Sequence, residues 1–267
     1  MKREPSVAGR FYYGDPGRLT SQVEQYILRD APKEKAIGIM SPHAGLMYSG
    51  GVAGAVYSSI DIPRTFILIG PNHTGMGRSV SLMGSGSWSI PTGEFLIDEE
   101  LAGKILKNTP LVADDAQAHK LEHSLEVQLP FIAYFSKDVN IVPISVMSAS
   151  LRDCEEIGRA VAEAVKETRY DVVVSASSDM SHYVSDETAR RLDNSAISEM
   201  LRLDPAALYS VVLKDRISMC GVLPATIMLY ASIALGAKEA RLLKYATSGE
   251  VSGDFAQVVG YAGVVVR

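Results

Sequence analysis

Short apolar runs alternate along the chain with longer segments in which apolar residues recur at helical spacing. Continuous apolar runs predict buried strands at Ala36–Met40, Thr65–Ile69, Asn140–Val146 and Asp171–Ala176. A strand that is apolar on both faces is typical of a parallel sheet covered by helices on both sides. The alternation therefore predicts an α/β fold with a mostly parallel central sheet flanked by helices on both faces.

Apolar residues spaced three or four positions apart predict the helices between these strands. We expect helices at Leu19–Leu28, Gly51–Ile60, Asp98–Lys107, Ser124–Phe135 with a break at Pro130, Leu151–Thr168, Asp186–Leu203, Pro205–Val212 and Pro224–Leu235. The Gly- and Ser-rich segment Gly75–Ser89 predicts a hairpin or long loop beside the crevice of the sheet. The final strands, Ala240–Tyr245 and Val258–Val265, are expected to pair antiparallel because their connection is too short for a crossover helix.

Length and composition place the chain among ordinary globular proteins. Of its 267 residues, 47% are hydrophobic and 21% are charged, and no linker, internal repeat or low-complexity segment divides it. We therefore expect one domain that covers residues 1–267. The net charge of −5 and the lack of a Lys/Arg block argue against a nucleic-acid partner.

No segment of the sequence predicts a membrane span. The longest uncharged stretch, Ile217–Ala237, contains Gly221 and Pro224 and is expected to form a loop followed by a buried helix. No apolar signal segment follows the charged N-terminus, so we expect a cytoplasmic location. There, Cys154 and Cys220 are expected to stay reduced, and Cys154 to be structural.

Three of the five histidines, His43, His73 and His182, lie in the loops that follow three of the predicted strands. In an open α/β sheet, the carboxyl ends of the strands form the crevice in which ligands bind. Neutral imidazoles from neighbouring strand ends bind iron, copper or zinc, so His43 and His73 are candidate metal ligands. A lone loop histidine is more often a surface residue, but the matched positions of this pair favour a site.

The loop after the last buried strand carries Asp179 three residues before His182. Asp179 could orient His182 as a general base, join a metal shell or cap a following helix, and spacing alone does not decide among these roles. Cys220 precedes a predicted helix, where a lowered pKa would make its thiol a nucleophile or a soft metal ligand. The alternative for Cys220 is a small buried residue.

The segment His119-Lys120-Leu121-Glu122-His123 matches the H-x-x-E-H pattern of inverzincin metalloproteases. On a helix, His119 and His123 would share a face and could hold zinc, with Glu122 as the base. A peptidase also needs a third ligand farther along the chain, and Glu126 is too near to provide it. Glu126 is instead expected to be a pocket-facing carboxylate or an acid in the first turn of a helix.

Several motifs, in order along nearly the whole chain, resemble the signatures of the Memo family (mediator of cell motility). They are Arg3-Glu4-Pro5-Ser6-Val7-Ala8-Gly9-Arg10-Phe11-Tyr12, Pro42-His43-Ala44-Gly45, Gly70-Pro71-Asn72-His73, Glu122-His123-Ser124-Leu125-Glu126-Val127-Gln128-Leu129-Pro130, Ser177-Ser178-Asp179-Met180-Ser181-His182-Tyr183 and Cys220-Gly221. Each motif is weak alone. Their agreement makes the resemblance specific.

The resemblance implies a fold like that of the class III extradiol dioxygenases, which hold iron(II) with two histidines and a glutamate and open catechol rings. It implies that His43 and His73 are metal ligands and that Cys220 takes the place of the third ligand. It also implies that His182 is an acid/base residue with Asp179 beside it. His123 would be a further pocket residue and, with His182 and Asp179, a candidate for catalysis, while His119 lies outside the matched signature.

Three functional hypotheses follow. The first is a redox enzyme that uses iron(II) or copper on a small organic substrate, since a thiolate ligand softens the site toward copper and zinc is the weaker expectation. The second is a binding module that accepts a peptide or another ligand in the same crevice, because the animal family is linked to phosphotyrosine-peptide recognition. The third is a zinc hydrolase that uses His119 and His123. A homo-oligomer is compatible with each of them.

Overall fold

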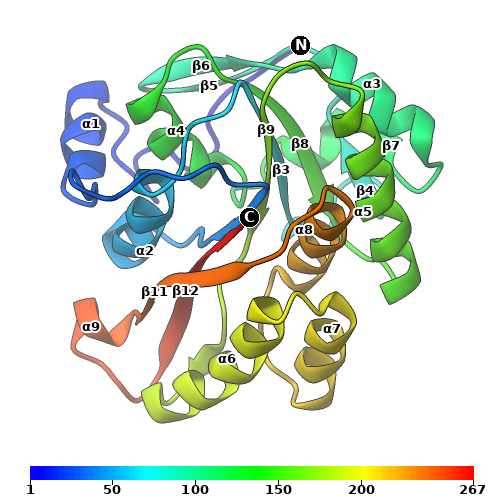
Figure 1. Ribbon diagram of the computed structural model, residues 1–267. Helices are drawn as coiled ribbons and strands as arrows, with labels where there is room; N and C mark the ends of the chain where they lie inside the picture. Colours follow the sequence, from blue (N-terminus) through cyan, green and yellow to red (C-terminus); the bar gives the residue numbers. More distant parts are fainter.

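The computed structural model describes residues Met1 to Arg267, and a large mixed sheet forms its centre (Figure 1). Four central strands lie in the order β2-β9-β3-β8 and run parallel. Their bounds are Gly38–Ser41 for β2, Val172–Ser177 for β9, Thr65–Pro71 for β3 and Asn140–Val146 for β8. All four fall at the positions of the predicted strands, which confirms the parallel core.

Antiparallel pairs extend this core on both sides. Strand β12 pairs with β2, and β11 and β10 pair with β12; on the other side β4 pairs with β8, and β7 then pairs parallel with β4. The bounds are Val258–Val266 for β12, Ala240–Thr247 for β11, His182–Val184 for β10, Val80–Leu82 for β4 and Ala113–Asp114 for β7. The expected antiparallel pairing of the last two long strands is confirmed, with the short helix α9 (Gly249–Ser252) between them.

Helices cover both faces of the sheet, as predicted. In Figure 1, α1, α2 and α4 lie on one side and α3, α5 and α8 on the other. The helix α7 packs between α8 and α6, and α6 reaches β11 and β12. The bounds are Pro16–Glu24 for α1, Leu46–Ser58 for α2, Glu99–Asn108 for α3, Leu129–Phe135 for α4, Leu151–Lys166 for α5, Asp186–Leu201 for α6, Pro205–Lys214 for α7 and Val222–Ala234 for α8.

Burial explains why these segments fold as they do. Every residue of β3 is buried, as expected for a strand covered on both faces. Helix α5 begins with a capping box made by Ser150 and Asp153 and buries one face, which contains Cys154. Helix α8 is buried along most of its length because it lies between the sheet and α5. The uncharged stretch is thus a loop followed by a core helix, as predicted. No helix in the structure combines the length and the apolar character that a bilayer crossing needs.

The structure corrects two helix starts and one break. The side chain of Asp15 caps α1, which therefore begins at Pro16, before the predicted position. Helix α2 begins at Leu46, also earlier than predicted. The segment expected as one helix with a break at Pro130 is a short 3₁₀ helix, η2 (Glu126–Gln128), followed by α4. Pro130 lies in the first turn of α4, where it starts the helix and does not break it.

The segment Gly75–Ser89, expected to be a hairpin or long loop beside the crevice, instead contains β4 of the main sheet and the start of a small second sheet. Strands β5 (Ser87–Ile90) and β6 (Gly93–Leu96) form a hairpin, and β1 (Lys2–Arg3) adds to it. Trp88 on β5 is fully buried, and nothing from the Gly- and Ser-rich segment lines the cavity at the histidines. The sheet ties the N-terminus to the main body of the fold.

Candidate metal centre

Three side chains lie two residues beyond the ends of three adjacent parallel strands. Strands β2, β3 and β9 end at Ser41, Pro71 and Ser177, and His43, His73 and Asp179 follow at the same interval. Ser41 pairs with Ser177 in the register of β2 and β9, so these ends meet at one edge of the sheet. The predicted crevice at the carboxyl ends of the strands is therefore present.

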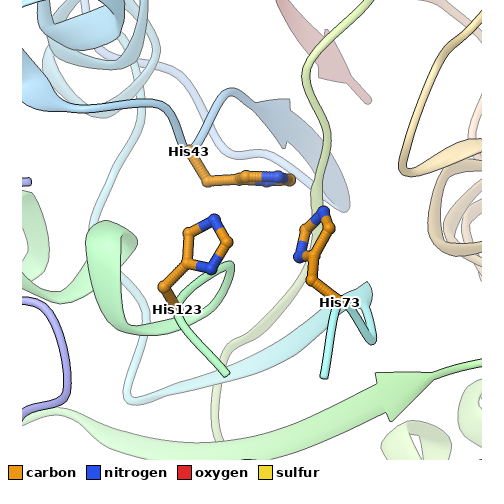
Figure 2. A group of neighbouring side chains, drawn as sticks. All are labelled: His43, His73 and His123. Atoms are coloured by element: carbon orange, nitrogen blue, oxygen red, sulfur yellow. The ribbon is translucent and has the colours of Figure 1, made fainter. Parts of the chain in front are cut away.

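His43, His73 and His123 form a group whose ring nitrogens, one from each residue, all lie within 4.8 Å of one another. Figure 2 shows the three rings turned toward a common space. Their ring centroids are 5.3 Å apart for His43 and His73, 5.6 Å for His43 and His123, and 4.7 Å for His73 and His123. Three imidazoles in this arrangement could hold a metal ion.

Hydrogen bonds fix which nitrogen His43 and His73 offer to that space. The Nδ1 of His73 lies 2.9 Å from a carboxylate oxygen of Glu122, which accepts its proton. The Nδ1 of His43 lies 2.9 Å from the hydroxyl oxygen of Ser177, whose own proton is donated to the carbonyl of Ser124. Both Nδ1 atoms are therefore donors, so the Nε2 atom of each ring carries the lone pair that can bind a metal ion. Partners of this kind orient the histidines of metal sites.

Burial keeps two of the three rings neutral. It lowers the pKa of His43 to about 3, and the nearby charge of His73 adds to that shift. It also lowers the pKa of His123 to about 4, with a further contribution from His43. For His73 burial acts in the same direction, but the hydrogen bond and charge of Glu122 outweigh it and raise the pKa. Neutral imidazole is the form that binds metal.

Cys220 lies beside His43 but outside the three-histidine group. Its Sγ is 3.4 Å from Nε2 of His43 and accepts a hydrogen bond from the main-chain N–H of Asp179 at 3.3 Å. Burial and the charge of Asp179 raise the pKa of the thiol, so the expected lowering by a helix N-terminus is wrong. The reason is that the sulfur is buried and lies near the charge of Asp179, while α8 begins only at Val222. The role of Cys220 as a metal ligand stays a prediction.

His182 and Asp179 both line the same cavity, but they do not pair. The Nδ1 of His182 donates to the carbonyl of Ser218 at 2.9 Å, which leaves Nε2 free. Asp179 accepts the main-chain N–H of His43 at 2.8 Å, and burial raises its pKa. The residues after Asp179 lead into the strand β10, and Ser185 caps the next helix. The catalytic roles of His182 and Asp179 stay predictions.

The comparisons with known proteins identify the family. Residues 3–265 match the family model described as Memo-like protein. This chain belongs to the Memo family. It is 39% identical to a MEMO1 family protein from Methanopyrus kandleri, an alignment that covers 100% of this chain and 99% of the relative. It is 42% identical to MEMO1 family proteins from Aquifex aeolicus and Pyrobaculum aerophilum, with 98% of each chain covered.

A solved structure shares the fold of this Memo family member. The crystal structure of an uncharacterized protein from Escherichia coli K12 superposes with a TM-score of 0.57 at 14% identity, covering 86% of this chain and 100% of that one. At this identity the likeness concerns the fold alone. The Memo resemblance expected from the motifs is confirmed by the family model and the relatives.

The H-x-x-E-H segment of the Memo chain does not form a helix that pairs its histidines. A 3₁₀ helix, η1 (Ala116–His119), ends at the first histidine, so His119 and His123 do not share a face. His119 is fully buried, with Nε2 3.2 Å from the carbonyl of Ser81 and its ring against Trp88. The geometry gives the zinc hydrolase no support, and we do not propose it.

Glu126 is an acid in the first turn of the 3₁₀ helix η2, as one expectation had it, but its carboxylate does not cap that helix and does not line the cavity. Its carboxylate pairs with Arg3 at 2.7 Å and accepts the hydroxyl of Tyr12 and the main-chain N–H groups of Ser6 and Val7. Burial would raise the pKa of Glu126, but the charge of Arg3 and these hydrogen bonds lower it. In this Memo protein, Glu126 anchors the N-terminal segment, residues 3–12, under the loop that carries His123.

A cavity of about 590 Å³ opens in front of the three histidines. Aromatic side chains line it, and its mouth is formed in part by the connection between β11 and β12. Sequence reasoning assigned these aromatic residues no role: Phe11 and Tyr183 lie within quoted motifs but were not singled out, and Tyr48 and Tyr261 belong to no local motif. It also missed Glu122 as the partner of His73 and Ser218 as the partner of His182.

Proposed function

We propose that this Memo-family protein binds a redox-active metal ion, iron(II) or copper, at His43 and His73, and acts on a small organic molecule in the adjoining cavity. The observation that supports this most strongly is the three-histidine group, whose ring nitrogens lie within 4.8 Å of one another. Imidazole is a good ligand for both metals. When bound, iron(II) or copper supplies the one-electron and dioxygen chemistry of such a site.

The third ligand is either His123 or Cys220. His123 belongs to the group of close nitrogens, whereas Cys220 has its sulfur 3.4 Å from Nε2 of His43. A thiolate ligand favours copper over iron(II), while a third imidazole suits both. We propose the set His43, His73 and Cys220, with His123 as the ligand that replaces the sulfur if the thiol stays protonated.

His182 moves a proton in this proposal. Its Nδ1 is held by the carbonyl of Ser218, so Nε2 is the atom that takes a proton from a hydroxyl of the ligand and returns it. His182 lines the cavity together with the three histidines, which places it beside any ligand there. The carboxylate of Asp179 accepts the main-chain N–H of His43, and this hydrogen bond keeps the His43 ring in place.

Metal content of protein purified under anaerobic, reducing conditions tests the proposal. We expect about one iron or copper per chain, and His43→Ala and His73→Ala to lower that content about tenfold or more, in line with the loss of a ligand. The control is His119→Gln, which changes a buried histidine outside the group and should keep the metal. Wild-type metal content in both ligand variants would overturn the proposal.

Sulfur ligation is decided by comparing the two thiols. Cys154 is buried in α5, far from the group in the sequence and outside the cavity lining, so Cys154→Ser is the matched control for Cys220→Ser. If Cys220 binds the metal, copper-loaded protein has a thiolate-to-copper absorption band that only Cys220→Ser removes. If the band is absent from the wild type and His123→Ala loses the metal, the third ligand is His123.

Redox function needs a separate measurement. We expect the bound metal to be oxidised by dioxygen and re-reduced by a chemical reductant, with dioxygen uptake that rises when small phenols are added and falls about 100-fold in His182→Gln. A protein that binds ligands in the cavity but carries no metal would instead be a binding module. Dioxygen uptake that stays the same when small phenols are added would contradict an oxidoreductase.

A further inference from the structure

The walls of the cavity are aromatic. Phe11, Tyr48, Tyr183 and Tyr261 line it, and Tyr48 and Tyr183 are 37% and 74% exposed. Aromatic faces on a cavity wall contact another ring well, by stacking or by edge-to-face packing. The cavity volume of about 590 Å³ suits a small organic molecule. Shape and lining therefore favour a planar, ring-containing ligand.

The backbone at Tyr183 is held in a costly conformation. Its φ is 58°, in the left-handed region that a bulky side chain rarely adopts. The register of β10 against β12 shifts between His182 and Val184, so a bulge lies at this tyrosine. A β-bulge beside a functional site changes the direction of a side chain, and backbone strain that persists at such a site indicates a functional role. The exposed ring of Tyr183 at the cavity is therefore a candidate ligand contact.

The acidic residues of the cavity lining have no lysine or arginine beside them in that lining. Asp179 lies at the histidine end of the cavity and Asp254 in the connection between β11 and β12. One oxygen of Asp254 accepts the main-chain N–H of Ala256 at 2.9 Å, and none of the ion pairs in the structure includes this carboxylate. An unpaired carboxylate at a cavity mouth attracts cations and repels anions.

We propose that the cavity takes a small aromatic amine, with its ring against Tyr48 and Tyr183 and its ammonium group at Asp254. This inference rests on the proposed function, because the other end of the ring then faces the three histidines. A cation near the exposed tyrosine faces gains a further attraction from the rings. At the mouth, the carboxylate of Asp254 disfavours the side arm of a carboxylate or phosphate ligand, and with it a phosphotyrosine peptide.

Three probes of similar shape separate the contribution of the ring to binding from the contribution of the charge. Tyramine, 4-ethylphenol and 3-(4-hydroxyphenyl)propionate share a phenol ring and carry a positive, a neutral and a negative side arm. Calorimetric titration of the metal-loaded protein without dioxygen is expected to give affinities in that order, with about a fivefold step for each change of charge. The steps should shrink in high salt, because salt screens exposed charges. Equal or tighter binding of the propionate, or binding of a phosphotyrosine peptide, overturns the proposal.

Two variants test the named residues. Asp254→Asn should weaken tyramine about fivefold and leave 4-ethylphenol unchanged. The matched control, Asp138→Asn, removes an exposed carboxylate just before the amino end of β8, at the opposite edge of the sheet, and should change neither affinity. Tyr183→Gly should weaken all three probes about threefold without lowering the unfolding temperature, since glycine relieves the left-handed backbone. An unchanged affinity for tyramine in Asp254→Asn would also overturn the proposal.

Metal content measured on the same preparations keeps the two proposals apart. If charge preference is found in protein without metal, the ligand class stands and the redox function fails. If metal is bound at His43 and His73 but the three probes bind alike, the metal site stands and the aromatic-amine inference fails.

Discussion

His119 and His123 lie at the two ends of one five-residue segment, yet their surroundings are opposite. His119 is fully buried, packs its ring on Trp88 and has one nitrogen, Nδ1, without a partner. The side chain of His123 is 21% exposed, and its ring faces the rings of His43 and His73. A metalloprotease motif on a helix would need the two histidines to act together. Here one belongs to the core and the other to the site.

The N-terminal segment explains this divergence. The guanidinium of Arg3 donates to the main-chain carbonyls of His119 at 2.7 Å and Glu122 at 2.6 Å, and it lies over the ring of Trp88. It also pairs with Glu126. Arg3 therefore fixes the main chain on both sides of the turn after which His123 enters the cavity. The chemistry of a short motif depends on the backbone that carries it, and a distant part of the chain sets that backbone.

The largest expected effect comes from removing Arg3. Arg3→Met leaves the buried carboxylate of Glu126 without its cation, and we expect the free energy of unfolding to fall by about 3–5 kcal/mol. Urea denaturation measures this loss. The double variant Arg3→Met with Glu126→Leu removes both charges and should recover most of the stability. A single variant within about 0.5 kcal/mol of the wild type would show that the N-terminal segment does not hold the loop.

Burial of neutral His119 predicts the next effect, a dependence of stability on pH. Burial first, and then the charge of Arg3, lower the pKa of His119 to about 4 from its ordinary value of 6.5. Between these values the unfolded chain binds a proton that the folded chain does not bind. Stability must therefore fall as the pH drops from about 6.5 to about 4, by up to about 3 kcal/mol for this residue.

His119→Gln isolates that contribution. Glutamine does not titrate, and its amide can still donate to the carbonyl of Ser81. We expect the wild type to lose stability more steeply than the variant over this pH range, when metal-free samples of both are unfolded in urea. Parallel curves for the two proteins would show that His119 has the same pKa in the folded and the unfolded chain, which would contradict its burial as a neutral residue of the core.

Much of the site could be predicted because it depends on strand ends. Apolar runs identified β2, β3 and β9, and the register of a parallel sheet then brings His43 and His73 together at one edge. The carboxyl edge of such a sheet is where ligands bind, so the position of the crevice followed from local sequence. The Memo motifs added the family, which the comparisons confirm.

The place of His123 could not be predicted in the same way. Its segment matches a helical motif, but contacts from residues far away in the sequence decide its path. Arg3 and Glu126 are 123 positions apart, and no spacing rule connects them. The strained backbone at Tyr183 and the position of Asp254 could not be predicted from the sequence either. Both residues are significant only because they line the cavity, which forms from distant parts of the chain.

The smallest expected effect on stability belongs to His123. In metal-free protein, His123→Ala should lower the free energy of unfolding by less than about 1 kcal/mol, because the ring is partly exposed and lies at the cavity edge, with Phe11 as an apolar neighbour. In metal-loaded protein the same variant should lose the additional stability that bound metal confers, if this imidazole is a ligand. Urea denaturation with and without a chelator separates the stability of the metal-free fold from the stability that bound metal adds. A large loss in metal-free protein would place His123 in the core with His119, and the two ends of the segment would then differ only in exposure.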